Sequence, residues 1–251
     1  MTSSAVVLKT EGLTKSFLGF VAVQDVNFTL HEGHIHAVIG PNGAGKTTFF
    51  NLLTKFLPPT SGRISYRGED ITRLKPAQIA RRGVVRSFQI SATFPHLTVL
   101  ENVRVALQRR LGTFYHFWRS EESLRVLDER ARELLAQVGL QDFAQFQAVE
   151  LPYGRKRALE IATTIALDPD LILLDEPTQG MGHEDIDRVK ALIMRVAAGR
   201  TVLMVEHNMS VVSDISDRIT VLQRGQILAE GTYAEVSGDP RVVSAYLGTA
   251  H

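Results

Sequence analysis

Residues 40–48 read GPNGAGKTT, and this stretch decides the fold. Its glycines and its lysine follow the spacing G-x-x-x-x-G-K-[ST], in which backbone amides surround a polyphosphate. An apolar run at residues 35–39 precedes the loop, and residues 48–54 are predicted to form the helix that follows. Strand, loop and helix therefore occur in the order that a phosphate-binding loop requires. The residues predicted to bind the nucleotide are Asn42, Gly43, Ala44, Gly45, Lys46, Thr47 and Thr48.

The start of the predicted helix adds chemistry to this loop. A helix N-terminus presents unpaired N–H donors and a partial positive charge, and both favour phosphate. Lys46 would reach the outer phosphates, and Thr47 would place its hydroxyl on Mg²⁺. A glycine-rich turn without a ligand is the alternative interpretation, and the order of the elements argues against it.

Size and composition indicate a globular protein. With 251 residues, 44% of them hydrophobic, the chain is long enough to bury a core in one domain or in two tightly joined lobes. The lack of cysteine excludes disulfides and thiolate chemistry, so any metal is expected to bind through oxygen. No apolar run approaches the roughly 18 residues of a membrane span, which predicts a cytoplasmic location. A formal net charge of +1 gives no general attraction to nucleic acid.

Three apolar runs end abruptly in polar residues, and they are residues 35–39, 171–174 and 202–205. Each is typical of a buried strand. The second is followed by Asp175 and the third, after one residue, by His207. Because the carboxyl ends of parallel strands share one crevice in an open α/β sheet, we expect these residues to lie beside the glycine loop.

The rest of the chain predicts two additions to a parallel core. The first 33 residues alternate apolar and polar positions, and residues 63–71, 219–222 and 227–229 are also strand-like, which indicates an antiparallel side sheet. The middle of the chain is predicted to be helical, with a capping box at Thr98-x-x-Glu101 and an apolar stripe that ends at Gly139. The predicted organisation is therefore a core of residues 1–88 and 166–251, interrupted by a helical subdomain of residues 89–165.

Two adjacent carboxylates follow the second apolar strand. Asp175 is placed to hold Mg²⁺, directly or through water, and Glu176 to orient and deprotonate an attacking water. An acidic pair after a strand is common as a mere cap, and its conjunction with the phosphate loop favours hydrolysis. A general base typically contributes about 10² to 10⁴ in rate, so loss of Glu176 is expected to spare binding and nearly abolish turnover.

Five segments, in this order along the chain, resemble the motifs of ABC-type ATPases. They are GPNGAGKTT (40–48), Gln89 in VRSFQIS (85–91), LPYGRKRALEIA (151–162), LILLDEPT (171–178) and His207 in VEHNM (205–209). The resemblance implies a P-loop NTPase core of α/β class, a parallel sheet flanked by helices, with an antiparallel β side sheet and an inserted α-helical subdomain. It also implies a cofactor pair, ATP and Mg²⁺, with Mg²⁺ held by Thr47, Gln89 and Asp175.

The same resemblance assigns further roles. Gln89, Glu176 and His207 would be catalytic, with His207 at the γ-phosphate. Two copies would dimerise head to tail, and residues of the signature loop would close over the partner copy's ATP: Pro152, Tyr153, Gly154 and Arg155. Phe17 would stack on adenine; an ordinary core position is the alternative for that aromatic. Because every base offers a π-face, such stacking does not exclude GTP.

A narrower resemblance concerns the transported solute. ARRGVVRSFQ (80–89), ISDRI (215–219) and VVSAYLG (242–248) resemble the ATP-binding subunit of branched-chain amino acid importers. Residues 111–119 lie where this subfamily has an extra stretch, and its aromatics would either pack within the chain or meet a partner: Phe114, Tyr115, Phe117 and Trp118.

Three positions depart from the family pattern. Pro152 replaces the usual signature serine and offers neither a hydroxyl nor an N–H, so neighbouring groups and the helix N-terminus must supply the donors. Gly182 stands where many relatives have Asp or Asn in the D-loop, and Arg155 replaces the usual glutamine. These departures put the contacts between two copies in doubt.

The resulting hypothesis is an ATP-hydrolysing subunit of an importer for branched-chain or other hydrophobic amino acids. Its expected partners are transmembrane permease subunits, docked near residues 89–101, a second ATPase copy, identical or a sister subunit, and indirectly a periplasmic or extracellular solute-binding protein. It would lie at the cytoplasmic face of the membrane. The alternatives are a urea or amide importer, a lipopolysaccharide-type exporter, a soluble ABC protein acting on DNA or ribosomes, and a nucleotide-binding scaffold without turnover.

Overall fold

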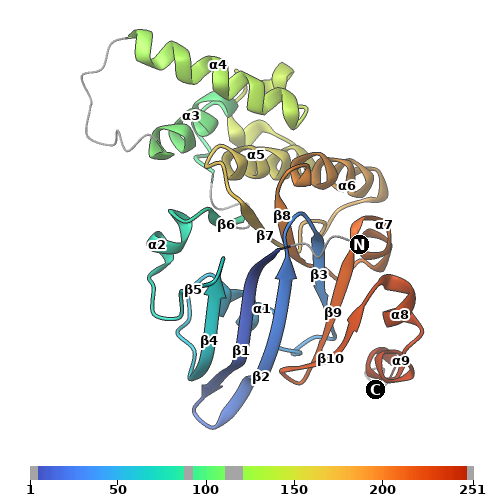
Figure 1. The fold of residues 1–251 in the computed structure, drawn as a ribbon. Helices are drawn as coiled ribbons and strands as arrows, with labels where there is room; N and C mark the ends of the chain where they lie inside the picture. Colours follow the sequence, from blue (N-terminus) through green and yellow to red (C-terminus); the bar gives the residue numbers. More distant parts are fainter. Residues whose placement is uncertain (1–4, 88–92, 111–120, 248–251) are drawn as a thin grey trace.

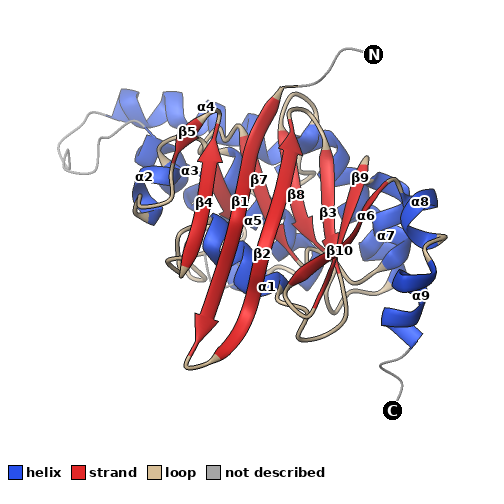
Figure 2. Cartoon of the chain, turned by 60° about the horizontal axis from the view of Figure 1, so that its bottom comes forward, coloured by secondary structure: helices blue, strands red, loops and turns tan. Residues whose placement is uncertain are grey.

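The chain folds around two β-sheets that face each other across one helix (Figures 1 and 2). The computed structural model describes residues 5–87, 93–110 and 121–247. The larger sheet has six strands, in spatial order β10 (Gln226–Gly231), β9 (Arg218–Gln223), β3 (Ile35–Ile39), β8 (Thr201–Val205), β7 (Leu171–Asp175) and β6 (Val84–Ser87). The side sheet has four, in order β2 (Phe20–His31), β1 (Val6–Phe17), β4 (Ser61–Tyr66) and β5 (Glu69–Asp70).

The larger sheet is parallel from β9 to β6, and only β10 runs antiparallel to its neighbour β9. The predicted strand pair at residues 219–229 therefore exists as a hairpin, but its assignment to the side sheet is wrong. Strand β9 is buried and pairs in parallel with β3, so the hairpin extends the core sheet. Alternation of apolar residues identified these strands without showing which sheet would accept them.

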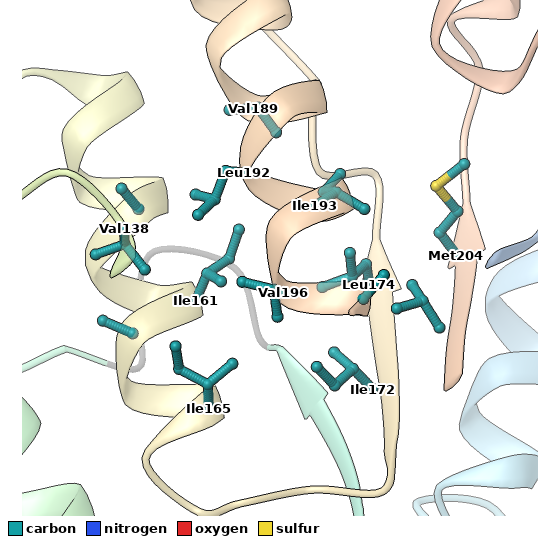
Figure 3. Close-up of a cluster of buried hydrophobic side chains, with 14 of the residues drawn as sticks. Val138, Ile161, Ile165, Ile172, Leu174, Val189, Leu192, Ile193, Val196 and Met204 are labelled. Atoms are coloured by element: carbon teal, nitrogen blue, oxygen red, sulfur yellow. The ribbon is translucent and has the colours of Figure 1, made fainter. Parts of the chain in front are cut away.

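Both faces of the larger sheet are covered, and its strands divide their side chains between two cores. Along β7, Ile172 and Leu174 belong to the core shared with the helices, whereas Leu171 and Leu173 belong to the core shared with the side sheet. This period of two is what a strand geometry imposes, and burial on both faces explains why the strand sequences are continuously apolar. Figure 3 shows the first core, where α5 and α6 side chains meet those of the strands.

The described helices are α1 (Lys46–Leu53), α2 (Pro76–Ala80), α3 (Val99–Arg110), α4 (Glu121–Gln137), α5 (Tyr153–Ile165), α6 (His183–Ala197), α7 (Met209–Ile215), α8 (Tyr233–Ser237) and α9 (Pro240–Leu247), with short 3₁₀ turns at Gln141–Phe143 and Ala148–Glu150. Helix α1 lies between the two sheets (Figure 2), where Phe49, Phe50 and Leu53 are fully buried. No helix in the described part of the chain is long and apolar enough to cross a membrane.

Helices α3, α4 and α5 form a region at one end of the larger sheet (Figure 1). The capping box predicted at its start is present, because Thr98 N donates to Glu101 Oε2 over 2.7 Å and Glu101 N donates to Thr98 Oγ1 over 3.2 Å. Helix α4 ends just before Gly139, whose φ of 72° suits glycine. A parallel core, an antiparallel side sheet and a helical region confirm the predicted fold class.

Candidate active site

The glycine loop, residues 40–48, joins the end of β3 to α1 at the carboxyl edge of the larger sheet. Helix α1 begins at Lys46, two residues earlier than predicted. Two glycines of the loop are required because other backbone segments lie very close to them. A Cβ on Gly40 would lie 2.1 Å from Leu222 O, and a Cβ on Gly45 would lie 2.4 Å from Ala22 O. Neighbouring backbone therefore fixes the path of the loop, and only glycine fits at these two positions.

Lys46 lies within this loop with its side chain buried. Its Nζ donates to Gly40 O over 2.6 Å and to Pro41 O over 3.0 Å, and burial lowers its pKa. No side chain caps the N-terminus of α1 at Gly45, and its first turn has no acidic residue. Helix amides and a lysine ammonium therefore converge on one loop, which is an arrangement that attracts phosphate.

The polar residues after β7 and β8 lie side by side. Strands β7 and β8 are neighbours, and Asp175 pairs with Val205 across them. Glu176 N donates to Val205 O over 2.9 Å, and Glu176 Oε1 lies 2.5 Å from His207 Nε2, within hydrogen-bonding distance. The backbone at Glu176 has a φ of 45°, a region that non-glycine residues rarely adopt and that is often found at functional sites.

Glu206 supports this edge of the sheet, although the sequence did not single it out for a role. Its side chain is 2% exposed, and its oxygens accept hydrogen bonds from four groups: Thr178 N, Thr178 Oγ1, His207 N and Asn208 N. The carboxylate thereby ties the loop after β7 to the loop after β8. An acidic residue directly after a buried apolar strand is the signal that marks it.

Two arginines also reach Asp175, and neither was predicted. The Arg86 guanidinium, on β6, forms an ion pair with the Asp175 carboxylate, and Arg86 NH1 donates to Asn51 Oδ1 over 2.6 Å. Arg157, on α5, donates from NH2 to the Asp175 carbonyl over 3.1 Å and from NH1 to Glu160 Oε2 over 2.5 Å. Side-chain exposures of 4% for Arg157 and 2% for Glu160 make the latter a buried ion pair.

The aromatic residue predicted to contact adenine is on the surface. Phe17 is 41% exposed at the end of β1, and the Lys15 ammonium lies 5.1 Å from the centre of its ring. The alternative of an ordinary core position is therefore wrong. An exposed ring remains available for stacking on a base, and that role stays a prediction.

The signature segment, residues 151–155, surrounds the start of α5. Pro152 is the residue before the helix, and Tyr153, 47% exposed, donates from its hydroxyl to Gln179 O over 3.1 Å. The Arg155 guanidinium lies 3.9 Å from the centre of the Phe143 ring. Within the described residues, no hydrogen bond or ion pair joins this segment to the glycine loop. Gly182 precedes α6 beside the segment, in a pocket that Pro152 also lines.

Several predicted positions lie outside the described residues. They are Gln89 and the aromatics Phe114, Tyr115, Phe117 and Trp118. The described residues contain no group of three or more His, Cys, Asp or Glu side chains that would hold a metal by themselves. Mg²⁺ usually takes only one or two carboxylates and completes its shell with phosphate and water, so the Asp175 carboxylate and the Thr47 hydroxyl fit a nucleotide-bound Mg²⁺.

A parallel sheet with a glycine-rich phosphate loop, adjacent acidic residues on the next strands and a helical region defines a P-loop nucleotide-binding protein. Comparison with known proteins makes this more specific. The family described as "ABC transporter" matches residues 23–179, and the family described as "Branched-chain amino acid ATP-binding cassette transporter" matches residues 226–251. The chain belongs to the ABC transporter ATP-binding family.

Individual relatives match along almost the whole chain. The high-affinity branched-chain amino acid transport ATP-binding protein BraF of Pseudomonas aeruginosa is 42% identical, over 97% of this chain and 98% of that protein. The corresponding protein LivG of Escherichia coli is 41% identical, over 97% and 98%. Among solved structures, the ADP conformation of an ATP-binding cassette of an ABC transporter superposes with a TM-score of 0.85 at 31% identity, covering 98% of this chain and 100% of that one.

Proposed function

We propose that this chain is the ATP-hydrolysing subunit of an importer for branched-chain or other hydrophobic amino acids. The observation that carries the proposal of ATP hydrolysis is the contact between Glu176 Oε1 and His207 Nε2. These atoms lie 2.5 Å apart, at the same edge of the sheet as the glycine loop. The solute class rests on similarity to BraF and LivG, both described as branched-chain amino acid transport proteins.

The proposed chemistry divides the work between the glycine loop and the residues that follow β7 and β8. Lys46 and the amides of α1 would hold the phosphates, and Glu176 would accept the proton of the attacking water. His207, hydrogen-bonded to Glu176, would orient that carboxylate and contact the γ-phosphate. Mg²⁺ bound with ATP, held by Thr47, Asp175 and Gln89, would neutralise charge on the phosphates.

A second copy would complete the site. Pro152, Tyr153 and Arg155 are exposed and Gly154 is half-buried, and among the described residues none of these four forms a hydrogen bond with the glycine loop of its own chain. A solved relative with a TM-score of 0.75 and 26% identity, covering 90% of this chain and 98% of that one, is described as dimeric in a post-hydrolysis state with ADP and Pi. We infer a head-to-tail dimer in which Pro152, Tyr153 and Gly154 approach the partner's ATP.

The permease would dock on a groove beside the helical region. A cavity of about 570 Å³ lies between β6, α2, α3 and α5, and it has an apolar lining that includes Phe56, Ile79, Phe94 and Val105. An apolar groove of this size is suited to a short helix of a membrane subunit. Such docking would hold the chain at the cytoplasmic face, with a solute-binding protein reached only through the permease.

The division into core residues 1–88 and 166–251 and a helical subdomain 89–165 is part of this proposal. Two features support it. Helix α5 ends at Ile165, at the upper boundary, and α3 and α4 are joined by an ion pair between Arg104 NH1 and Asp128 Oδ1 at 3.0 Å. Helix α5 also packs on α6 and the strands, so it would connect the helical unit to the core.

Phosphate release by the chain assembled with its membrane subunits tests the proposal. Glu176→Gln keeps the shape of the side chain but removes the base, so turnover should fall by about 10² to 10⁴ while ATP binding persists. Glu129→Gln is the matched control, because Glu129 is an exposed residue of α4 that lines neither the signature segment nor the glycine loop. Wild-type turnover in Glu176→Gln, measured with equal ATP binding, would disprove the assigned role.

A further inference from the structure

Arg86 spans two elements that meet at the predicted metal position. One guanidinium nitrogen contacts the carboxylate of Asp175, at the end of β7, and the other donates to Asn51 Oδ1 over 2.6 Å. The side chains of Arg86 and Asp175 are 10% and 15% exposed, so this ion pair is largely shielded from water. Shielding strengthens the attraction between the charges and makes the arrangement specific.

Asn51 links this contact to the phosphate loop. It lies four residues after Thr47 in the same helix, α1, and residues at that spacing share one helix face. Thr47 and Asp175 are the two described residues predicted to contact Mg²⁺. The Arg86 guanidinium therefore bridges the two elements, α1 and the end of β7, from which those oxygens come.

A guanidinium and Mg²⁺ compete when both would contact the same carboxylate. Both are cations, and their mutual repulsion is strong where water is largely excluded. An ion that draws on Asp175 therefore weakens the hold of Arg86 on the same group, and Arg86 weakens the hold of the ion. This reciprocity follows from linkage between two ligands of one site.

We propose that Arg86 is a positioning residue that competes with Mg²⁺ for the Asp175 carboxylate and so sets how strongly Mg²⁺ and nucleotide favour each other's binding. The inference rests on the proposed function, because it assumes that Mg·nucleotide binds at the glycine loop. Arg86 would act only through Asp175.

The direct measurement is the affinity for ADP in excess Mg²⁺ and in excess EDTA, by calorimetry. The ratio of the two affinities reports the coupling between metal and nucleotide, and general damage to the nucleotide site cancels in it. Removing the guanidinium in Arg86→Met or Arg86→Gln should raise this ratio by about tenfold, since a hydrogen bond to a charged group is lost from the competing side. Arg86→Lys, which restores a cation, should return the ratio toward the wild-type value.

Two further proteins make the test specific. Arg104→Gln is the matched control, because Arg104 also pairs with a carboxylate, Asp128, but in the helical region; its ratio should equal that of the wild type. In an Asp175→Asn background, Arg86→Met should no longer change the ratio, because the shared carboxylate is gone. Circular dichroism verifies folding, and the Met and Gln variants serve as alternatives if one of them does not fold.

The outcomes separate this inference from the proposed function. A folded Arg86 variant with a wild-type ratio, or one whose ratio changes equally in the Asp175→Asn background, overturns the role of Arg86 while leaving nucleotide binding intact. Absence of ADP binding to the wild-type chain, with and without Mg²⁺, would instead overturn the proposed nucleotide site itself. A raised ratio that depends on Asp175 supports both.

Discussion

The glycine loop and the signature segment carry the two halves of the proposed ATP site, and they are built in opposite ways. The glycine loop is fixed by its own chain, because backbone atoms of Ala22 and Leu222 leave no room for a side chain at two of its glycines. The signature segment instead has Pro152, Tyr153 and Arg155 exposed around the start of α5. One half is complete within a single chain, and the other is presented outward.

Helix α5, which starts in the signature segment, contains a buried ion pair between Arg157 and Glu160, and breaking it should have the largest effect. Glu160→Ala leaves the Arg157 guanidinium buried without its carboxylate, which typically costs about 3 to 5 kcal/mol of unfolding free energy. Urea unfolding measures the loss. Because Arg157 also donates to the Asp175 carbonyl, the link between α5 and the end of β7 would loosen at the same time.

Glu133→Ala is the matched control for this prediction. Glu133 pairs with Arg130 at the same i, i+3 spacing and a similar distance of 2.6 Å, but these side chains are 45% and 61% exposed. Exposed pairs contribute about 0 to 1 kcal/mol, so this variant should unfold almost as the wild type does. Equal losses in the two variants would show that burial does not decide the strength of the α5 link.

The second prediction separates the two halves directly. Lys46→Ala removes the buried ammonium of the glycine loop, and ADP binding to the isolated chain should weaken by about a hundredfold, the upper range for charge-assisted hydrogen bonds. Tyr153→Ala, in the signature segment, should leave that affinity unchanged. Equilibrium binding of fluorescent ADP to the monomer tests both. Comparable weakening by Tyr153→Ala would mean that the segment serves the site of its own chain.

A third prediction concerns the strand that supports the glycine loop. His36, on β3, is fully buried, with its Nε2 2.7 Å from Thr220 Oγ1 and its ring 4.9 Å from that of Phe28. Burial and then the charge of Arg218 lower its pKa to about 3 from 6.5. Below pH 6.5 the unfolded chain binds a proton at His36, whereas the folded chain does not bind it until about pH 3. The free energy of unfolding therefore decreases as the pH is lowered from 6.5 to about 3.

Denaturant unfolding at pH 7 and pH 5 measures this effect. The slope is about 1.4 kcal/mol per pH unit, so His36 should account for about 2 kcal/mol between pH 6.5 and 5. His36→Gln keeps a hydrogen-bonding side chain but does not titrate, and the difference between the two proteins isolates the histidine from carboxylates. An equal loss of stability in wild type and variant would rule out the depressed pKa.

Sequence patterns predicted which residues lie at the glycine-loop half of the site. They did not predict the side chains that contact those residues. Apolar runs ending in Asp175 and His207 placed those residues on one sheet edge, because parallel strands impose that geometry. Arg86 could not be paired with Asp175 in the same way, since the two are 89 residues apart and the pairing depends on β6 lying next to β7. The edge hairpin was misplaced for the same reason: strand neighbours follow from tertiary packing.

The smallest expected effect concerns the signature segment, the half of the site that is presented outward. Pro152→Ser would restore a hydroxyl and an N–H at the start of α5, and one added neutral hydrogen bond is typically worth about 1 kcal/mol, so ATP turnover of the assembled transporter should rise by about fivefold. ADP affinity of the isolated chain should not change, because Pro152 makes no hydrogen bond to the glycine loop among the described residues. If serine strengthens binding to the single chain instead, the signature segment contacts its own nucleotide, and the division between an inward and an outward half is wrong.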